Sequence, residues 1–364
     1  GTGSTVIKTL DHPFDVSDRN SLENMLSFMG SGEVMKYYWI TPDIYHHLFG
    51  QLAPDEVSLF ASTETELVVE ASGLISRDGT VELMPWVALE TVPPVVVSGE
   101  YSIDALDATD QVLASQGFDV SFVALTNPPI DLEMAPFQTA IPFPAGTVAF
   151  QIRQGSEILH RVEVSEHTPS VVVTFPNGGE SWGSIGDATI TWSGSDEDGD
   201  TIYYTVLYTP DGIDVITLGA NITATQTTIA LGEIPGGDGA RIQVIATDGI
   251  NTSLDESDAT FAVADKGPMA YILSPESNTT IPSRTSFYLR GYSYDLEDGN
   301  LGDMSLVWHS SRDGDLGFGR LLLVNLSPGY HIITLTATDS TGAQAEDEIL
   351  IFIGSLLYLP FCLK

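Results

Sequence analysis

The sequence predicts a mainly β chain, built from tandem antiparallel β-sandwiches and preceded by a short helical segment. From about residue 55 onward, short runs rich in Val, Ile, Thr and aromatic residues alternate with turns made of Gly, Asn and Asp. Such runs are typical of strands, because branched and aromatic side chains suit a pleated sheet and Gly and Asn tolerate tight turns. No helical periodicity separates the runs, which favours sandwiches over βαβ units.

The N-terminal segment differs from the rest of the chain because residues 16–53 carry a helical pattern. Ile44, Leu48 and Leu52 are spaced four residues apart and therefore share one face of a helix. We expect a helical lead-in over residues 1–54.

Three sandwiches are expected after this lead-in, over residues 55–168, 169–265 and 266–354, with an apolar tail over 355–364. Seven of the ten tail residues are Leu, Tyr, Phe or Cys, so we expect the tail to be covered by its own sandwich or by another subunit. The clearest expected strands are 66–72, 81–86, 149–153, 171–175, 189–192, 203–208, 241–246, 286–292 and 331–337.

The second and third of these units repeat one pattern. Each opens with an apolar strand that ends in Pro, and a later strand leads into an acidic loop, 195–200 or 294–299. Each also has a late strand that ends in Ala-Thr-Asp, at Asp248 or Asp339. Two copies of roughly 90 residues fit two tandem sandwiches.

Short phrases within the repeats carry a family resemblance. They are Pro176-Asn-Gly-Gly-Glu-Ser-Trp182 in the second unit and His331-Ile-Ile-Thr-Leu-Thr-Ala-Thr-Asp339 in the third. These phrases resemble immunoglobulin-like, fibronectin type III-like and PKD-like modules that are appended to secreted prokaryotic enzymes. The resemblance covers about half of the chain. It implies an immunoglobulin-like fold but no particular function, because this architecture serves adhesion, spacing and carbohydrate binding alike.

A second resemblance lies in the helical segment, where Leu26-Ser-Phe-Met-Gly30 precedes Tyr38-Trp-Ile-Thr-Pro-Asp-Ile-Tyr45. This order is similar to the end of metzincin-type zinc peptidase domains, where a Met-turn lies beneath the zinc-binding histidines and a final helix packs behind it. The resemblance implies that the catalytic part of a longer precursor would precede Gly1. The alternative is that Met29 and Trp39 are core residues of an unrelated helical lead-in.

The histidines argue against catalysis by this chain itself. Zinc-dependent proteolysis needs two His one helical turn apart with a neighbouring Glu, and the sequence contains no His-Glu-x-x-His. The segment Gly179-Glu-Ser-Trp-Gly183 matches the nucleophile elbow of α/β-hydrolases, but a turn precedes it and an alternating strand follows, which favours a hairpin. We therefore expect no catalytic residue, no cofactor other than Ca²⁺ and no zinc.

The acidic loops are the candidate metal sites, because carboxylate clusters suit Ca²⁺ and its about six to eight oxygen ligands. In an immunoglobulin-like sandwich the loops after the second and sixth strands lie at the same end, which brings Asp248 and Asp339 toward these loops. The alternative is a solvated turn that its Asp residues only shape. The candidate Ca²⁺ ligands are Asp196, Asp198, Asp200, Asp248, Asp295, Glu297, Asp298 and Asp339.

Composition bears on location and partners. The chain has 13 Lys+Arg against 50 Asp+Glu, a net charge of −37, which repels phosphate and anionic headgroups. We expect no nucleic-acid partner and no membrane span, since no apolar run reaches about 18 residues. An extracellular or cell-surface location fits this acidity and the scarcity of Lys. The candidate glycosylation sites there are Asn221, Asn251, Asn278 and Asn325.

Two functions fit these observations best. The first is a non-catalytic C-terminal β-sandwich portion of a secreted, metzincin-like peptidase protein, which serves spacing, surface attachment or substrate binding. The second is a self-assembling extracellular filament or surface-layer subunit. A hydrolase whose site the sequence does not reveal is a third alternative. The partners would be an extracellular protein or polysaccharide, or copies of the chain itself.

Overall fold

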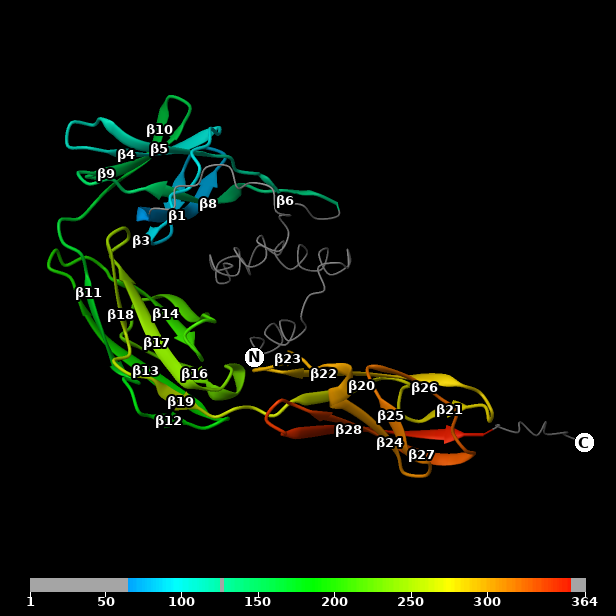
Figure 1. Cartoon of the computed structure of the whole chain (residues 1–364). Coiled ribbons are helices and arrows are strands. Elements are labelled where there is room, and N and C mark those ends of the chain that lie inside the picture. The colour runs from blue at the N-terminus through cyan, green and yellow to red at the C-terminus, as the bar shows by residue number, and fades with distance from the viewer. Residues whose placement is uncertain (1–64, 125–127, 355–364) are drawn as a thin grey trace, which may run out of the picture.

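The computed structural model describes residues 65–124 and 128–354, and this part of the chain is almost entirely β-strand. Six principal sheets stack in pairs as three sandwiches, which follow one another along a bent path (Figure 1). The predicted class of tandem antiparallel sandwiches is confirmed. The expected helical lead-in and apolar tail lie outside the described residues. Among those residues, no helix is long and apolar enough to cross a membrane.

The first sandwich contains β1 to β10. One sheet has the order β2-β1-β3, with β8 also paired to β1, and the other has the order β10-β9-β4-β5. Trp86, Ile103 and Phe150 are fully buried between them. The strands are β1 Glu66–Ser76, β2 Val81–Leu83, β3 Val87–Thr91, β4 Tyr101–Leu106, β5 Val112–Phe118, β6 Val123–Ala124, β7 Ile130–Asp131, β8 Met134–Pro142, β9 Ala149–Gln154 and β10 Glu157–Glu163.

The second sandwich contains β11 to β19. Its sheets have the orders β11-β13-β16 and β12-β19-β17-β14-β15, with β18 also beside β17. Alternate residues of β13, Ala188, Ile190 and Trp192, point into the core, as expected for a strand with one buried face. The elements are β11 Ser170–Phe175, β12 Ser181–Trp182, β13 Asp187–Ser195, β14 Tyr203–Thr209, β15 Ile216–Ile222, β16 Gln226–Ala230, η1 Leu231–Glu233, β17 Gly237–Thr247, β18 Thr252–Glu256 and β19 Phe261–Val263.

The third sandwich contains β20 to β28. Its sheets have the orders β20-β22-β23, with β26 also beside β22, and β21-β28-β27-β24-β25. Leu289, Trp308 and Ile351 have no exposed surface and lie in its core. The elements are β20 Met269–Ser274, β21 Thr279–Ile281, β22 Phe287–Asp295, β23 Gly299–Asn300, η2 Asp303–Ser305, β24 Leu306–Ser310, β25 Gly314–Phe318, β26 Leu321–Val324, β27 Gly329–Thr338 and β28 Gln344–Ile353.

Candidate functional site at the joints between sandwiches

The acidic loops lie at the two joints between consecutive sandwiches. The first joint consists of the linker 164–169 with the loops 196–200 and 248–251, and the second of the linker 264–268 with the loop 295–299. Loops 196–200 and 295–299 follow β13 and β22, which run antiparallel to the first strands β11 and β20. Each loop therefore returns to the end where the chain enters its sandwich.

In both joints, a loop carboxylate accepts the backbone N–H of the residue that lies three positions before the first strand. Asp198 accepts the N–H of His167 at 2.7 Å, and Glu297 accepts the N–H of Lys266 at 3.2 Å. Hydrogen bonds to an ionised group are stronger than bonds between neutral groups. Both repeats therefore fix their own linker at the same position.

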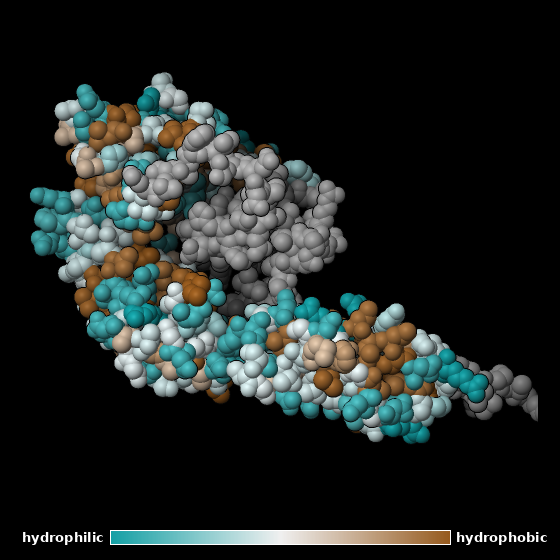
Figure 2. All heavy atoms as spheres, viewed as in Figure 1, coloured by the Kyte–Doolittle hydropathy of each residue, from teal (hydrophilic) through white to brown (hydrophobic). Residues whose placement is uncertain are grey.

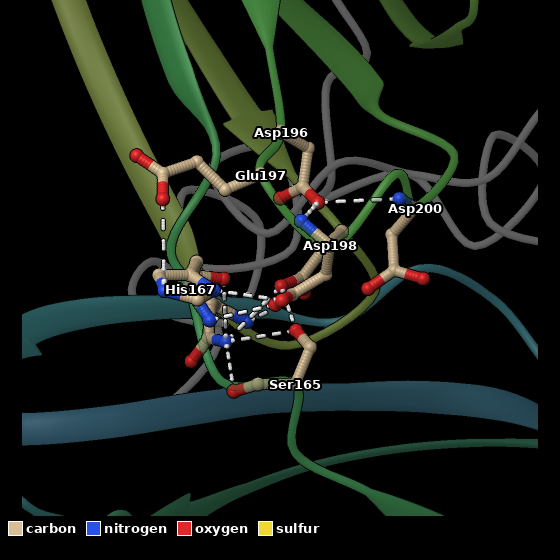
Figure 3. A network of polar contacts seen from close by, with 8 residues as sticks. Ser165, His167, Asp196, Glu197, Asp198 and Asp200 are labelled. Carbon is tan, nitrogen blue, oxygen red and sulfur yellow. Dashed lines mark hydrogen bonds and ion pairs between the residues drawn. The ribbon is translucent and has the colours of Figure 1, made fainter.

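At the first joint, the loop wraps around one carboxylate (Figure 3). Asp196 Oδ1 accepts the N–H groups of Asp198 at 2.9 Å and Asp200 at 3.2 Å. Asp196 Oδ2 is buried and, within the described part of the chain, has no hydrogen-bond partner. One carboxylate oxygen from each of these three residues lies within 4.8 Å of the others. The structure thus brings together three of the expected metal ligands.

The imidazole of His167 is part of this cluster. Its Nδ1 lies 2.7 Å from Asp198 Oδ1, and its Nε2 lies 3.6 Å from Glu197 Oε2. The hydrogen bond to Asp198 raises the pKa of the His167 ring, and the same bond lowers the pKa of Asp198. The pKa of Asp200 is raised, first by lost hydration and then by the charges of Asp196 and its acidic neighbours. The cluster therefore carries more negative charge than the single imidazole of His167 can neutralise.

Asp248 reaches the first joint, as expected for the loop after a late strand. Its Oδ1 accepts the N–H groups of Ile250 at 2.9 Å and Asn251 at 2.8 Å, and its Oδ2 accepts the hydroxyl of Ser165. The side-chain amide of Asn251 lies 3.1 Å from the Ser165 carbonyl oxygen and 3.3 Å from that of His167. The loop and the linker are consequently bonded at several points.

The turn between β17 and β18 also docks onto the first sandwich. The N–H of Trp86 donates to the Gly249 carbonyl at 3.0 Å, and the Thr247 hydroxyl donates to the Trp86 carbonyl at 2.6 Å. Ile250, at the tip of the turn, is only 2% exposed and packs in the core of the first sandwich. The first joint is therefore held by apolar packing as well as by hydrogen bonds.

The second joint buries its carboxylates more deeply. Asp295 is 2% exposed, and its Oδ1 accepts the N–H groups of Glu297 and Asp298, both at 2.9 Å. Glu297 also accepts the N–H of Gly236, so it bonds both to the linker and to the second sandwich. Glu297 lines a pocket of about 540 Å³ between the second and third sandwiches.

The remaining expected ligands, Asp298 and Asp339, lie in neighbouring loops but do not face one another. Asp298 accepts the N–H of Ser340 at 2.7 Å and its hydroxyl at 2.8 Å. Asp339 instead accepts the N–H groups of Thr341 and Ala343, at 2.9 and 2.8 Å, within its own turn. The two loops therefore meet through Ser340.

The sequence did not single out Ser165, His167, Gly236 or Lys266, all of which bond across the joints. None of these positions belongs to a periodic pattern or a motif. The only signal is shared by His167 and Lys266, which lie three residues before the first strand of each repeat. Ile250 offered a clearer signal, because an apolar residue at the tip of an Asp-Gly-Ile-Asn turn is unusual for a solvated turn.

Three of the four candidate glycosylation sites are exposed: Asn221, Asn278 and Asn325. Asn251 differs because its amide nitrogen, the atom that would carry the sugar, is directed at the linker carbonyls of the first joint. Exposed aromatic side chains can stack on sugars, and two aromatic residues of the third sandwich differ in exposure. Trp308 has no exposed surface, whereas Tyr330 is 66% exposed.

No nucleophile elbow forms at the G-x-S-x-G segment. Ser181 belongs to the short strand β12, which pairs in parallel with β19 and does not lead into a helix. A strand-to-helix turn is what exposes the serine of an α/β-hydrolase. The segment is thus part of a sheet, but it joins a parallel pair with a strand distant in sequence and not the expected hairpin.

Comparison with known proteins gives likenesses of fold. No protein-family model and no curated protein matches the chain. Among solved structures, fibronectin(III)-like modules of CbhA from Clostridium thermocellum share 19% identity, with 51% of this chain and 94% of that chain covered and a TM-score of 0.23. A titin fragment shares 10% identity, with 52% and 100% covered and a TM-score of 0.27. Dimeric latent PorU from Porphyromonas gingivalis shares 14%, with 52% and 24% covered and a TM-score of 0.21. Scores this low carry no argument about function.

Proposed function

We propose that the chain is a non-catalytic spacer of a secreted multidomain protein, whose sandwiches are joined at set angles. The observation that carries this proposal is the repeated bond from an acidic loop to the preceding linker, Asp198 to His167 and Glu297 to Lys266. A flexible tether needs no such bond, because Gly- and Ser-rich linkers give free motion. The spacer would keep a preceding domain, such as the peptidase that residues 26–45 resemble, away from a surface or a substrate.

Small-angle X-ray scattering of the whole chain tests the spacer. The expected profile is that of one bent particle with the arrangement of sandwiches described above. A profile that requires a broad ensemble of inter-sandwich angles would reject a set spacing. The same sample should show no zinc by elemental analysis and no proteolysis. Stoichiometric zinc with chelator-sensitive activity would reject the non-catalytic part of the proposal.

Self-assembly is the second candidate function, and an exposed apolar strip on the third sandwich favours it. Tyr288, Leu321 and Leu323 are 53%, 57% and 56% exposed, and β26 pairs with β22 so that Leu323 lies opposite Tyr288. Figure 2 shows hydrophobic residues gathered on this sandwich. Within the described residues β26 pairs with β22 alone, which leaves an edge available to another strand.

Analytical ultracentrifugation distinguishes the two functions. If the chain assembles through β26, the wild-type protein should sediment as a concentration-dependent oligomer and Leu323→Lys should be monomeric. Val172→Lys, at a residue that is 53% exposed in the second sandwich, is the matched control and should leave assembly unchanged. A wild-type chain that is monomeric at all concentrations would reject assembly and leave the spacer.

A further inference from the structure

Two buried carboxylate oxygens at the second joint have no hydrogen-bond partner in the described part of the chain. They are Asp295 Oδ2 and Glu297 Oε2. The other oxygen of each group is fully used, since Asp295 Oδ1 accepts two backbone N–H groups and Glu297 Oε1 accepts those of Gly236 and Lys266. The backbone therefore fixes both carboxylates and leaves one oxygen of each free for another ligand.

The two carboxylates belong to one turn, in which Asp295 Oδ1 accepts the backbone N–H of Glu297 at 2.9 Å. A buried charge without a counter-charge is costly, and two like charges in contact cost more. Some positive species must therefore balance the pair.

Within the described residues, no cationic side chain is hydrogen-bonded or ion-paired to either carboxylate. Lys266 and Glu297 attract each other, but the Lys266 ammonium donates to the Ala264 carbonyl at 2.9 Å. The Tyr208 hydroxyl, on β14, is also committed, because it donates to the Pro235 carbonyl at 2.7 Å.

The pocket beside Glu297 is acidic. Asp211, Asp214 and Asp238 of the second sandwich line it, together with Gly236 and Leu296. A cation that enters through this pocket is attracted by these carboxylates, because like charges on the walls of a cleft add their fields. The pocket also leaves room for water molecules to complete the coordination shell.

We propose that a hard divalent cation, for which Ca²⁺ is the probe, binds between Asp295 Oδ2 and Glu297 Oε2 in the second joint. Carboxylate oxygens are the ligands that Ca²⁺ prefers, and extracellular modules bind it with dissociation constants of about 0.1–1 mM. Because Glu297 also bonds to the linker and to Gly236, the bound cation stiffens the angle between the second and third sandwiches. The site exists whether or not the chain is a spacer. At the first joint, Asp196 Oδ2 is likewise buried and without a hydrogen-bond partner in the described residues, but Asp198 and Asp200 are exposed, so Ca²⁺ there stays a prediction.

Equilibrium dialysis of the full chain against Ca²⁺, after removal of divalent ions, tests the site. Asp295→Asn and Glu297→Gln preserve the acceptor oxygens that bond to the backbone, so both variants keep the fold. Each should bind one Ca²⁺ fewer per chain than the wild type. Asp200→Asn, at the first joint, is the matched control and should retain this ion. In chelator, both second-joint variants should melt no lower than the wild type, because the repulsion is gone.

Two results would overturn the proposal. The first is a wild-type chain that binds no Ca²⁺, or second-joint variants that bind as many ions as the wild type. The second is a proton in place of the cation. In that case the wild type would gain melting temperature as the pH falls and would not respond to Ca²⁺, whereas Glu297→Gln would lose this pH response.

Discussion

At both joints a carboxylate of an acidic loop bonds to the linker, but the burial of that loop differs between the two. At the first, the Asp198 side chain that bonds to the linker is 24% exposed. It forms an ion pair with the ring of His167, which is 44% exposed. At the second, Asp295 is 2% exposed. Solvent can screen the first cluster, whereas we propose that a bound cation balances the second. We therefore expect burial, and not the number of acids, to decide which joint gains more stability from a cation.

The joints also differ in how much apolar contact supports them. At the first joint, Ile250 of the second sandwich packs in the core of the first sandwich. The described contacts of the second joint are mainly polar, through Glu297 to Gly236 and Lys266. We therefore expect the first joint to be held largely by packing and the second largely by charge.

The largest effect is expected from Ile250→Ala. Truncation of a buried Ile costs about 2–5 kcal/mol, so the free energy of unfolding of the first sandwich should fall by about that amount. Ile332→Ala, at a residue 44% exposed on the third sandwich, is the control and should cost far less. Urea denaturation of both variants measures the difference, and equal costs would show that Ile250 does not hold the first joint.

A smaller effect is expected from Asn251→Ala, which removes the amide that reaches the carbonyls of Ser165 and His167. Loss of a partly buried hydrogen-bonding group costs about 1–2 kcal/mol. Asn325→Ala is the control, because that amide is exposed and reaches only the Ser286 hydroxyl at 3.4 Å. Hydrogen exchange should increase in the linker 164–169 for the first variant alone. Unchanged exchange there would show that Asn251 does not hold the linker.

The smallest effect concerns pH at the first joint. The pKa of His167 is raised in the folded chain, so its contribution to stability is fully present below its ordinary pKa of 6.5 and is lost as the pH rises through the raised value. The pKa of Asp198 is lowered, so its contribution is present above 3.8 and is lost as the pH falls through the lowered value. The pair is therefore strongest between these limits.

NMR titration of the His167 ring checks this pair. Asp198→Asn should bring the His167 pKa down, because the amide keeps a hydrogen-bonding group but removes the charge. Glu197→Gln should have a smaller effect, since Glu197 is a lesser cause of the shift. A His167 pKa that is the same in all three proteins would contradict the ion pair.

The sequence predicted the strands and the acidic loops because both are local patterns. All nine strands that it marked most clearly are present, although 241–246 is extended to Gly237–Thr247 and 81–86 is shortened to Val81–Leu83. The approach of Asp248 to the loop 196–200 followed from the topology of an immunoglobulin-like sandwich. The linker bonds could not be predicted, because their partners lie 31 to 86 residues apart and depend on the angle between two sandwiches.

The measurement that tests the account most directly is the distance distribution between spin labels on either side of each joint. Labels at Ala108 and Ile185 span the first joint, and labels at Ile185 and Tyr330 span the second, in a chain whose single cysteine, Cys362, is replaced by Ser. We expect narrow distributions across both joints in Ca²⁺. Glu297→Ala should broaden only the second distribution, and Asp198→Ala should broaden only the first, and by less, because Ile250 also holds that joint. Wild-type distributions as broad as those of the variants would show that the loop-to-linker bonds do not set the angles between the sandwiches.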